Sequence, residues 1–190
     1  MDILTSIHGR RIGLGPNDEL LLAGKAIYLD NNGVPTPVAR VGSDKIIAAG
    51  ATKALTLLDA GRVIKLDQLA GSVVTLPAAS GSGARYSFYV GVLATSNSHK
   101  IQVANALDFM VGIIMGTRVD VGNAVLGFAA ANSGTVATNS DTITLNRTTT
   151  GSVTVGEWLE VEDVAANTWL VTGMLSATGA AFATPFTAAV

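Results

Sequence analysis

Apolar and polar residues alternate over short distances along most of the chain, and turn-forming residues separate the apolar groups. From Thr52 onward, stretches rich in β-branched residues are interrupted by Gly, Asn, Asp and Pro, and helical periodicity is scarce. Ten strands are expected: Lys53–Leu58, Arg62–Leu66, Ser72–Leu76, Tyr86–Leu93, Lys100–Ala104, Phe109–Met115, Val125–Ala129, Thr142–Asn146, Trp158–Glu162 and Trp169–Met174. Strands at this spacing suggest a sandwich, jelly roll or barrel, and we expect an all-β, β-sandwich or jelly-roll-like domain over residues 51–190.

Residues 141–146 have the strict alternation of a half-buried strand. The apolar residues Ile143 and Leu145 alternate with Thr142 and Thr144. Because successive side chains of a strand point to opposite faces, the two apolar residues are expected in the core and both threonines outside.

Both tryptophans are predicted to lie in one C-terminal hairpin. Trp158 shares a strand face with Glu160 and Glu162, and the apolar residues between them point to the other face. Turn-prone residues 165–167 then precede a second β-rich run, which contains Trp169. At least one of the two indoles is expected to be substantially buried.

The first 50 residues have a different pattern, because glycines at positions 9, 13, 15 and 24 interrupt every apolar group. We expect an extended N-terminal arm over residues 1–50, with a short hairpin around the Asp-Asn-Asn-Gly turn at residues 30–33. An apolar arm of this kind would be poorly soluble by itself, so it is predicted to dock on a neighbouring subunit. The expected interface residues are Ile3, Leu4, Ile7, Arg10, Arg11, Ile12 and Leu14.

The composition indicates extensive contact with other subunits. Hydrophobic residues make up 48% of the chain and charged residues only 14%, against about 25% charged in a typical soluble domain. No apolar run approaches the roughly 20 residues of a membrane helix, so other subunits are the expected cover. The sequence therefore predicts a homo-oligomer without a membrane partner. Arg10-Arg11 is the only adjacent basic pair, so no nucleic acid partner is expected either.

Few residues offer recognisable catalytic or cofactor chemistry. The absence of cysteine excludes disulfides, zinc-thiolate sites and thiol catalysis. His8 and His99 lie far apart without metal-ligand spacing, which favours surface or hydrogen-bonding roles. Residues 30–33 lack the downstream Glu of a calcium loop, and the Ser-Gly-Ser-Gly run at residues 80–83 is expected to be a flexible loop. We therefore expect no metal, no cofactor and no enzymatic activity.

An acidic group, Glu157, Glu160, Glu162 and Asp163, leaves one enzymatic alternative open. Glu160 and Glu162 on one strand face would lie ~6.8 Å apart by strand rise, within the broad range for an inverting glycosidase. Aromatic residues for sugar stacking are scarce, at 5% of the chain. A solvated acidic face is the favoured interpretation, and a hydrolase is the alternative.

Several short segments together resemble a known family. Residues 54–67 and 71–78 contain a strand, an acidic-glycine turn, a second strand and a Val-Thr-Leu-Pro strand end. Residues 95–101, 141–146 and 169–173 have a similar texture. Across residues 50–190, the chain resembles the capsid decoration, or cement, proteins of tailed bacteriophages.

The resemblance implies a β-rich trimer on the outer capsid surface of a virion, assembled in the host cytoplasm. The implied partner is the major capsid protein, and the implied role is to clamp neighbouring capsid proteins and stabilise the shell. The same module occurs in phage fibres and tails. The alternative is therefore a tail or head fibre module that binds host-surface glycans, with loops 80–83 and 132–139 exposed for that purpose.

Overall fold

The structure is a computed structural model that describes residues 45–120, 124–178 and 182–190 in full. Within residues 1–44 it describes the backbone of five short strands. The chain divides into two compact units, Met1–Arg40 and Val41–Val190. We refer to the second unit as the β domain.

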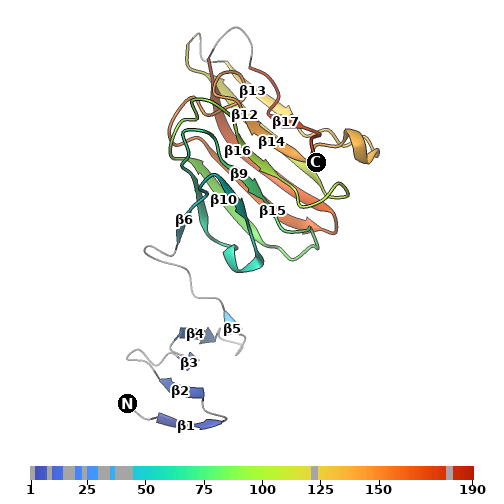
Figure 1. Ribbon diagram of the computed structural model, residues 1–190. Helices are drawn as coiled ribbons and strands as arrows, with labels where there is room; N and C mark the ends of the chain where they lie inside the picture. The colour runs from blue at the N-terminus through green and yellow to red at the C-terminus, as the bar shows by residue number, and fades with distance from the viewer. Residues whose placement is uncertain are drawn as a thin grey trace. The chain divides into compact units, whose positions relative to one another are not determined.

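The first unit is a run of short strands, each paired antiparallel with the next (Figure 1). They are β1 (Ile3–Ile7), β2 (Arg10–Leu14), β3 (Leu20–Leu22), β4 (Lys25–Leu29) and β5 (Pro35–Thr36). The pairing of β4 with β5 spans the turn sequence at residues 30–33, where a hairpin is predicted. The sequence predicts an extended arm in this region, whereas in the structure these five strands pair with one another. Docking of this unit on a neighbouring subunit stays a prediction.

The regular secondary structure of the β domain is almost all strand, and the strands form two mixed sheets. The strands are β6 (Ile46–Ala48), β7 (Thr52–Ala54), β8 (Val63–Leu66), β9 (Val73–Thr75), β10 (Arg85–Val90), β11 (His99–Gln102), β12 (Phe109–Arg118), β13 (Val125–Ala129), β14 (Thr142–Leu145), β15 (Trp158–Ala165), β16 (Thr168–Ala177) and β17 (Phe186–Thr187). One sheet has seven strands in the order β13-β12-β16-β15-β10-β8-β6, and the other has five in the order β17-β14-β11-β9-β7. Two short 3-10 helices, η2 (Leu57–Asp59) and η3 (Val136–Thr138), lie in connections.

All ten predicted strands are present, one with the predicted bounds and nine with shifted ends, which confirms a mostly β fold. The strand predicted over Lys53–Leu58 is wrong in its second half, because η2 begins at Leu57. The carboxylate of Asp59 accepts hydrogen bonds from the backbone N–H and the hydroxyl of Thr56, and this local bonding favours a helical turn. The short strands β6 and β17 were not expected. Because β6 joins the seven-stranded sheet, the division between the units falls at Arg40 instead of residue 50.

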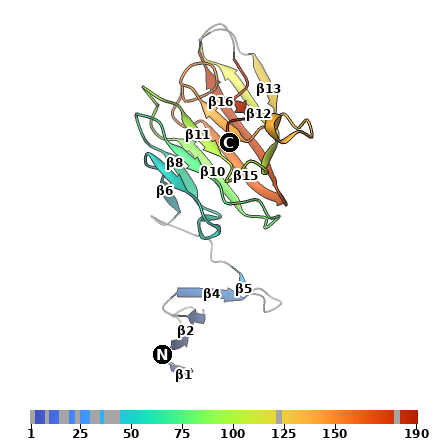
Figure 2. The ribbon, with the colours of Figure 1, turned by 45° about the vertical axis from the view of Figure 1, so that its right-hand side comes forward.

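The buried side chains of both sheets form one hydrophobic core. The seven-stranded sheet contributes Ile64, Phe88 and Trp169, among others, and the five-stranded sheet contributes Val74 and Ile101. In Figures 1 and 2 the longer strands of the β domain run along the same diagonal. One face of each sheet therefore supplies the apolar interior of the domain.

The strand β14 shows how far alternation alone predicts burial. Ile143 and Leu145 are buried, as expected, and Thr144 is partly exposed. Thr142 is only 1% exposed, so the expectation that both threonines lie outside the buried interior is wrong for Thr142. The strand β17 pairs with β14 at this position, and the Thr142 hydroxyl donates a hydrogen bond to the Asp141 carboxylate at 2.8 Å.

The predicted C-terminal hairpin is confirmed by the antiparallel pairing of β15 with β16. Asn167 in its turn has φ +60°, a left-handed conformation that asparagine tolerates. Trp169 is fully buried, and its ring centroid lies 5.9 Å from that of Tyr86. Trp158 points to the opposite face and is 44% exposed. One buried indole and one surface indole therefore belong to the same hairpin.

We expect Trp169→Ala to lower the free energy of unfolding by about 3–5 kcal/mol, because it opens a cavity at a fully buried position. Trp158→Ala should cost less than about 1 kcal/mol, because the side chain already contacts solvent. Urea denaturation of both variants measures the difference. Equal effects of the two substitutions would contradict the assignment of the two faces.

Candidate functional site

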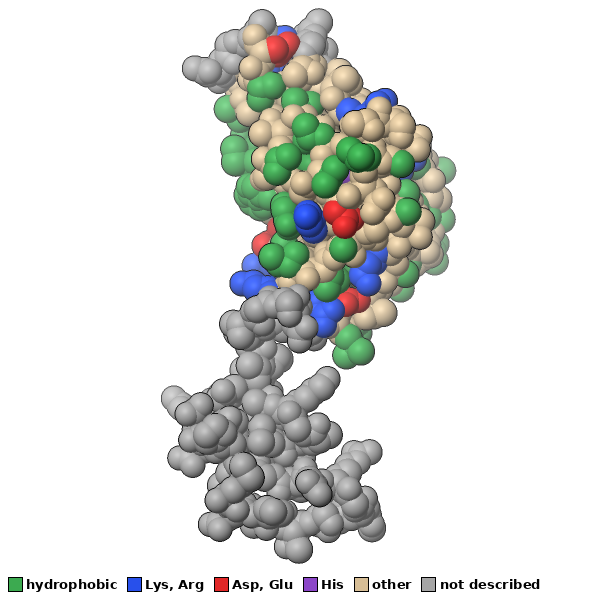
Figure 3. All heavy atoms as spheres, turned by 60° about the vertical axis from the view of Figure 1, so that its left-hand side comes forward, with side chains coloured by type: hydrophobic (Ala, Val, Ile, Leu, Met, Phe, Trp, Pro, Cys, Tyr) green, Lys and Arg blue, Asp and Glu red, His purple; other side chains and the backbone are tan. Residues whose placement is uncertain are grey.

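The outer face of the seven-stranded sheet, opposite the core, carries a group of exposed apolar side chains. These residues, which we call the apolar outer face, are Ile113 and Met115 on β12, Trp158 on β15, and Leu170 and Met174 on β16, with exposed fractions between 37% and 53%. The alternate residues of the same strands fill the core. On the face of the β domain that Figure 3 shows, hydrophobic side chains reach the surface at many points, with charged side chains scattered among them.

Strand register brings residues distant in sequence into one row across this face. Trp158 is paired with Met174, and Met174 with Met115. Leu170 is paired with Val111, which lies two residues before Ile113 on the same face of β12. Neighbouring side chains on one sheet face lie close enough to pack together. The apolar outer face is therefore continuous over three strands, and nothing in the described part of the chain covers it.

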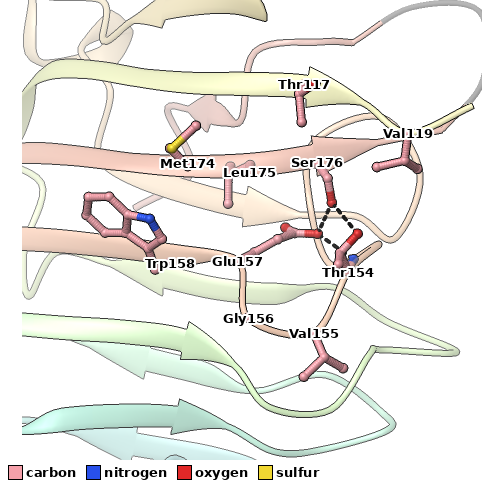
Figure 4. A pocket seen from close by; sticks show the side chains of 10 residues that line it. All are labelled: Thr117, Val119, Thr154, Val155, Gly156, Glu157, Trp158, Met174, Leu175 and Ser176. Carbon is pink, nitrogen blue, oxygen red and sulfur yellow. Dashed lines mark hydrogen bonds between the residues drawn. The ribbon is translucent and has the colours of Figure 1, made fainter. Parts of the chain in front are cut away.

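A shallow open depression of about 330 Å³ borders this face (Figure 4). Trp158 and Met174 line one side of it, and the loop with Val155 and Gly156 lines another. The polar side chains that line it include Thr154, Glu157 and Ser176, and Figure 4 shows hydrogen bonds among them. Because these groups already bind one another, the depression offers mainly apolar surface to a partner.

Glu157 is buried and holds the loop that precedes β15. Its carboxylate accepts hydrogen bonds from the backbone N–H groups of Ser152, Val153 and Thr154, each at 2.7 Å. The hydroxyl of Ser176 donates a further bond at 2.5 Å. A carboxylate with four donors is saturated as an acceptor. Glu157 thus fixes the loop against β16.

Asp163 plays the same part for the loop at residues 80–83. Its carboxylate accepts bonds from the backbone N–H groups of Ser80, Gly81 and Ser82 and from both serine hydroxyls, at 2.7 to 3.1 Å. Burial alone would raise the pKa of Asp163. The bonds from the side chain and backbone of Ser82, and from the Gly81 and Ser80 backbone, outweigh burial and lower the pKa to about 2.

These two anchors correct two predictions. The loop at residues 80–83 is expected to be flexible, yet its backbone and hydroxyls are bound to Asp163. A solvated face is also the wrong interpretation for Glu157 and Asp163, which are 7% and 1% exposed. The burial of Asp163 could have been predicted from the sequence. Asp163 lies two residues after Val161 and therefore shares the inward face of β15.

Glu160 and Glu162 do lie on the solvent side of β15, as predicted. A single cation, Arg85 on β10, forms ion pairs with both, at 3.1 Å to Glu160 and 2.5 Å to Glu162. The charges are therefore partly neutralised by the neighbouring strand, in an exposed setting where such pairs add little stability. Each carboxylate of the acidic group thus has a structural partner.

His99 is a buried hydrogen-bonding residue, which agrees with one of its two predicted roles. Its Nδ1 accepts a bond from the backbone N–H of Ser72 at 3.0 Å, so the proton lies on Nε2, which donates to the carbonyl of Val92 at 2.9 Å. Burial lowers the pKa of His99, although the bond to Val92 opposes this. The ring is therefore neutral at pH 7, and both nitrogens are occupied.

Within the fully described ranges, no group of three or more His, Asp or Glu side chains is arranged to hold a metal ion. His8 lies outside the described residues. The backbone brings the predicted interface residues onto two paired strands. Ile3, Leu4 and Ile7 lie in β1, and Arg10, Arg11, Ile12 and Leu14 lie in β2. Their side chains lie outside what the structure describes.

Comparison of the chain with protein-family models, with curated proteins and with solved structures finds no match. None of the helices in the described part of the chain has the length and apolar character needed to cross a membrane.

We expect Asp163→Asn to destabilise the β domain by at least about 2 kcal/mol at pH 7, because an amide cannot accept all the bonds that the carboxylate receives. The folded-state pKa of about 2 lies below the usual unfolded value of about 3.9. Stability from this group is therefore complete above about pH 4 and is lost as the pH falls toward 2.

Urea denaturation at several pH values measures this dependence. The difference between Asp163→Asn and the unsubstituted chain should be largest at pH 7 and shrink below pH 4. Glu160→Gln is the matched control, because its carboxylate is partly exposed and should show a much smaller effect. A difference that stays constant from pH 7 to pH 2 would contradict the role of the charge.

Proposed function

We propose that this chain is a structural protein of a tailed-bacteriophage virion, a capsid decoration subunit that binds the outer surface of the assembled shell. The observation that carries the proposal is the apolar outer face, a continuous group of exposed hydrophobic side chains on three paired strands of one sheet. Exposed apolar groups of this kind mark protein contact sites. The resemblance of residues 50–190 to decoration proteins supplies the class of partner, the major capsid protein.

The finer fold that we propose for the β domain is a β-sandwich. Two sheets that share one hydrophobic core support this arrangement. Several neighbouring strands are parallel, including β12 with β16 and β8 with β10, whereas jelly rolls are antiparallel. The sandwich is therefore favoured over the jelly roll.

The mechanism in this proposal is binding alone. A subunit that binds the assembled lattice better than the free capsid protein stabilises the lattice by mass action. A sheet face suits this task, because its backbone is held by the strand ladders and needs little further ordering on binding. The contacts of the acidic group support a non-enzymatic role. The carboxylates of Glu157 and Asp163 accept hydrogen bonds that hold loops in place. The carboxylates of Glu160 and Glu162 both form ion pairs with Arg85.

Self-association belongs to the same proposal. The chain has 48% hydrophobic and 14% charged residues, and obligate oligomers are the proteins in which such surfaces become buried. The resemblance implies a trimer, located on the capsid of a virion assembled in the host cytoplasm.

The alternative, a fibre or tail module that binds host-surface glycans, has less support. Sugar sites commonly use exposed aromatic rings, and Trp158 is the only aromatic residue among the exposed large hydrophobics of the described ranges. The loop at residues 80–83 is bound to Asp163, and residues 132–139 contain no aromatic residue.

We expect Met174→Glu to weaken binding to capsids assembled without this protein by at least about tenfold, because it buries a charge at the centre of an apolar contact. Leu69→Glu is the control, since Leu69 is 60% exposed in the connection between β8 and β9 and lies outside the apolar outer face. Cosedimentation with purified capsids measures both affinities. Equal binding of the two variants would refute the outer face as the capsid contact.

Deletion of residues 1–15 should leave thermal unfolding of the β domain nearly unchanged, because these residues belong to the other compact unit. The same deletion should weaken capsid binding, since the segment carries the predicted interface residues of β1 and β2. Calorimetry and cosedimentation test the two halves of this prediction. A truncated chain that binds capsids as tightly as the full chain would contradict docking by this segment.

A further inference from the structure

The two sheets of the β domain end in four edge strands, and these edges are not alike. The strands β6 and β7 have three residues each and β17 has two, whereas β13 has five. Natural proteins protect sheet edges with short strands, charged residues or proline. Lys45 lies next to β6 and Lys53 lies within β7. The edge formed by β13 has none of these protections.

The strand β13 and its C-terminal flank are apolar and uncharged. From Ala124 to Ala131 there is no charged residue and no proline. Val125 is 51% exposed and Leu126 is 43% exposed. On the side facing the interior, Phe128 stacks on Phe182 with ring centroids 4.9 Å apart, which holds the strand in place. The edge is therefore both ordered by packing and open to a partner.

Backbone geometry shows which groups of β13 point outward. The N–H of Ala130 donates to the carbonyl of Gly112 on β12 at 3.0 Å. In an antiparallel pair alternate residues bond to the same neighbour, so Leu126 and Phe128 also face β12. Val125, Gly127 and Ala129 then direct their N–H and C=O groups away from the sheet. Among the described residues no strand pairs with them on that side.

We propose that β13 pairs antiparallel with β13 of a second copy of this chain, across a two-fold axis at Gly127. This contact joins two copies and is different from the three-fold contact of the trimer that the resemblance implies. The outward groups are symmetric about that residue, so Gly127 would face Gly127 and Val125 would face Ala129 of the other copy. Self-pairing brings no like charges together, because the strand has none. The other edges offer two or three residues only, so they form fewer bonds with β13.

The joined sheet would also continue the apolar outer face across the axis. A Cβ on Gly127 would lie 3.4 Å from Sδ of Met115 and 3.6 Å from Cγ2 of Ile113, so these side chains already lie beside the edge. Two copies would bring both pairs of side chains near the axis. The contact uses the edge of the sheet and leaves its outer face free, so this inference does not depend on capsid binding.

Disulfide formation tests the proposal directly, because the chain has no cysteine of its own. Facing residues of an antiparallel pair have Cα atoms about 5.5 Å apart, which a disulfide can span. The full-length Gly127→Cys variant should form a covalent dimer under mild oxidation at least about ten times faster than Val164→Cys, an exposed strand position away from the edge. Equal rates for the two variants would overturn the proposal.

A second pair of variants tests the backbone bonds. Gly127→Pro removes an outward N–H without touching the ladder to β12, and should weaken dimerisation at least about tenfold in sedimentation equilibrium. Gly127→Ala is the control, because a Cβ there makes only ordinary contacts. If Gly127→Pro dimerises as tightly as Gly127→Ala, the self-pairing is wrong.

The outcomes also separate this proposal from the proposed function. Rapid cross-linking at position 127 without capsid binding would support the self-pair and refute the decoration role. Capsid binding by a chain that stays monomeric and does not cross-link would overturn the self-pair alone, and would indicate that another protein occupies the edge.

Discussion

Burial of one face of each sheet in a single shared core is the constraint on which the rest of the β domain depends. The side chains that fill this core come from strands of both sheets, from Ile64 and Trp169 on one side to Val74 and Ile143 on the other. Because strand side chains alternate, fixing the inward set also fixes the outward set. Placing Met110 and Ile114 in the core puts Ile113 and Met115 outside, and so creates the apolar outer face.

Carboxylates in this domain act as anchors for irregular backbone. Asp163 and Glu157 replace the strand ladder where the chain leaves regular structure, and each satisfies several backbone N–H groups at once. Buried N–H groups need partners, and an ionised acceptor provides stronger bonds than a neutral one. Charged residues are scarce in the sequence, and two of the carboxylates, those of Asp163 and Glu157, order loops.

The surfaces that remain open follow from the same organisation. A sheet has two faces and two edges, and the core occupies one face. In the seven-stranded sheet, the second face is apolar at Ile113 and Met115 on β12, at Leu170 and Met174 on β16 and at Trp158 on β15, beside the acidic pair Glu160 and Glu162. The β13 edge is apolar and long. Together they present a face suited to a large flat partner and an edge suited to a strand. Both the apolar outer face and the β13 edge would be more stable when covered by protein, so both favour assembly with other subunits.

The sequence by itself determined the fold class, the ten main strands and the C-terminal hairpin, because alternation and turn residues are local signals. It also determined that Ile143 and Leu145 lie inside. Only the tertiary structure decided which strands are neighbours, and hence that Trp158, Met174 and Met115 form one row. The partners of Asp163 lie more than 80 residues away along the chain. Pairing over such distances depends on the packing of the whole core, and no local pattern encodes it.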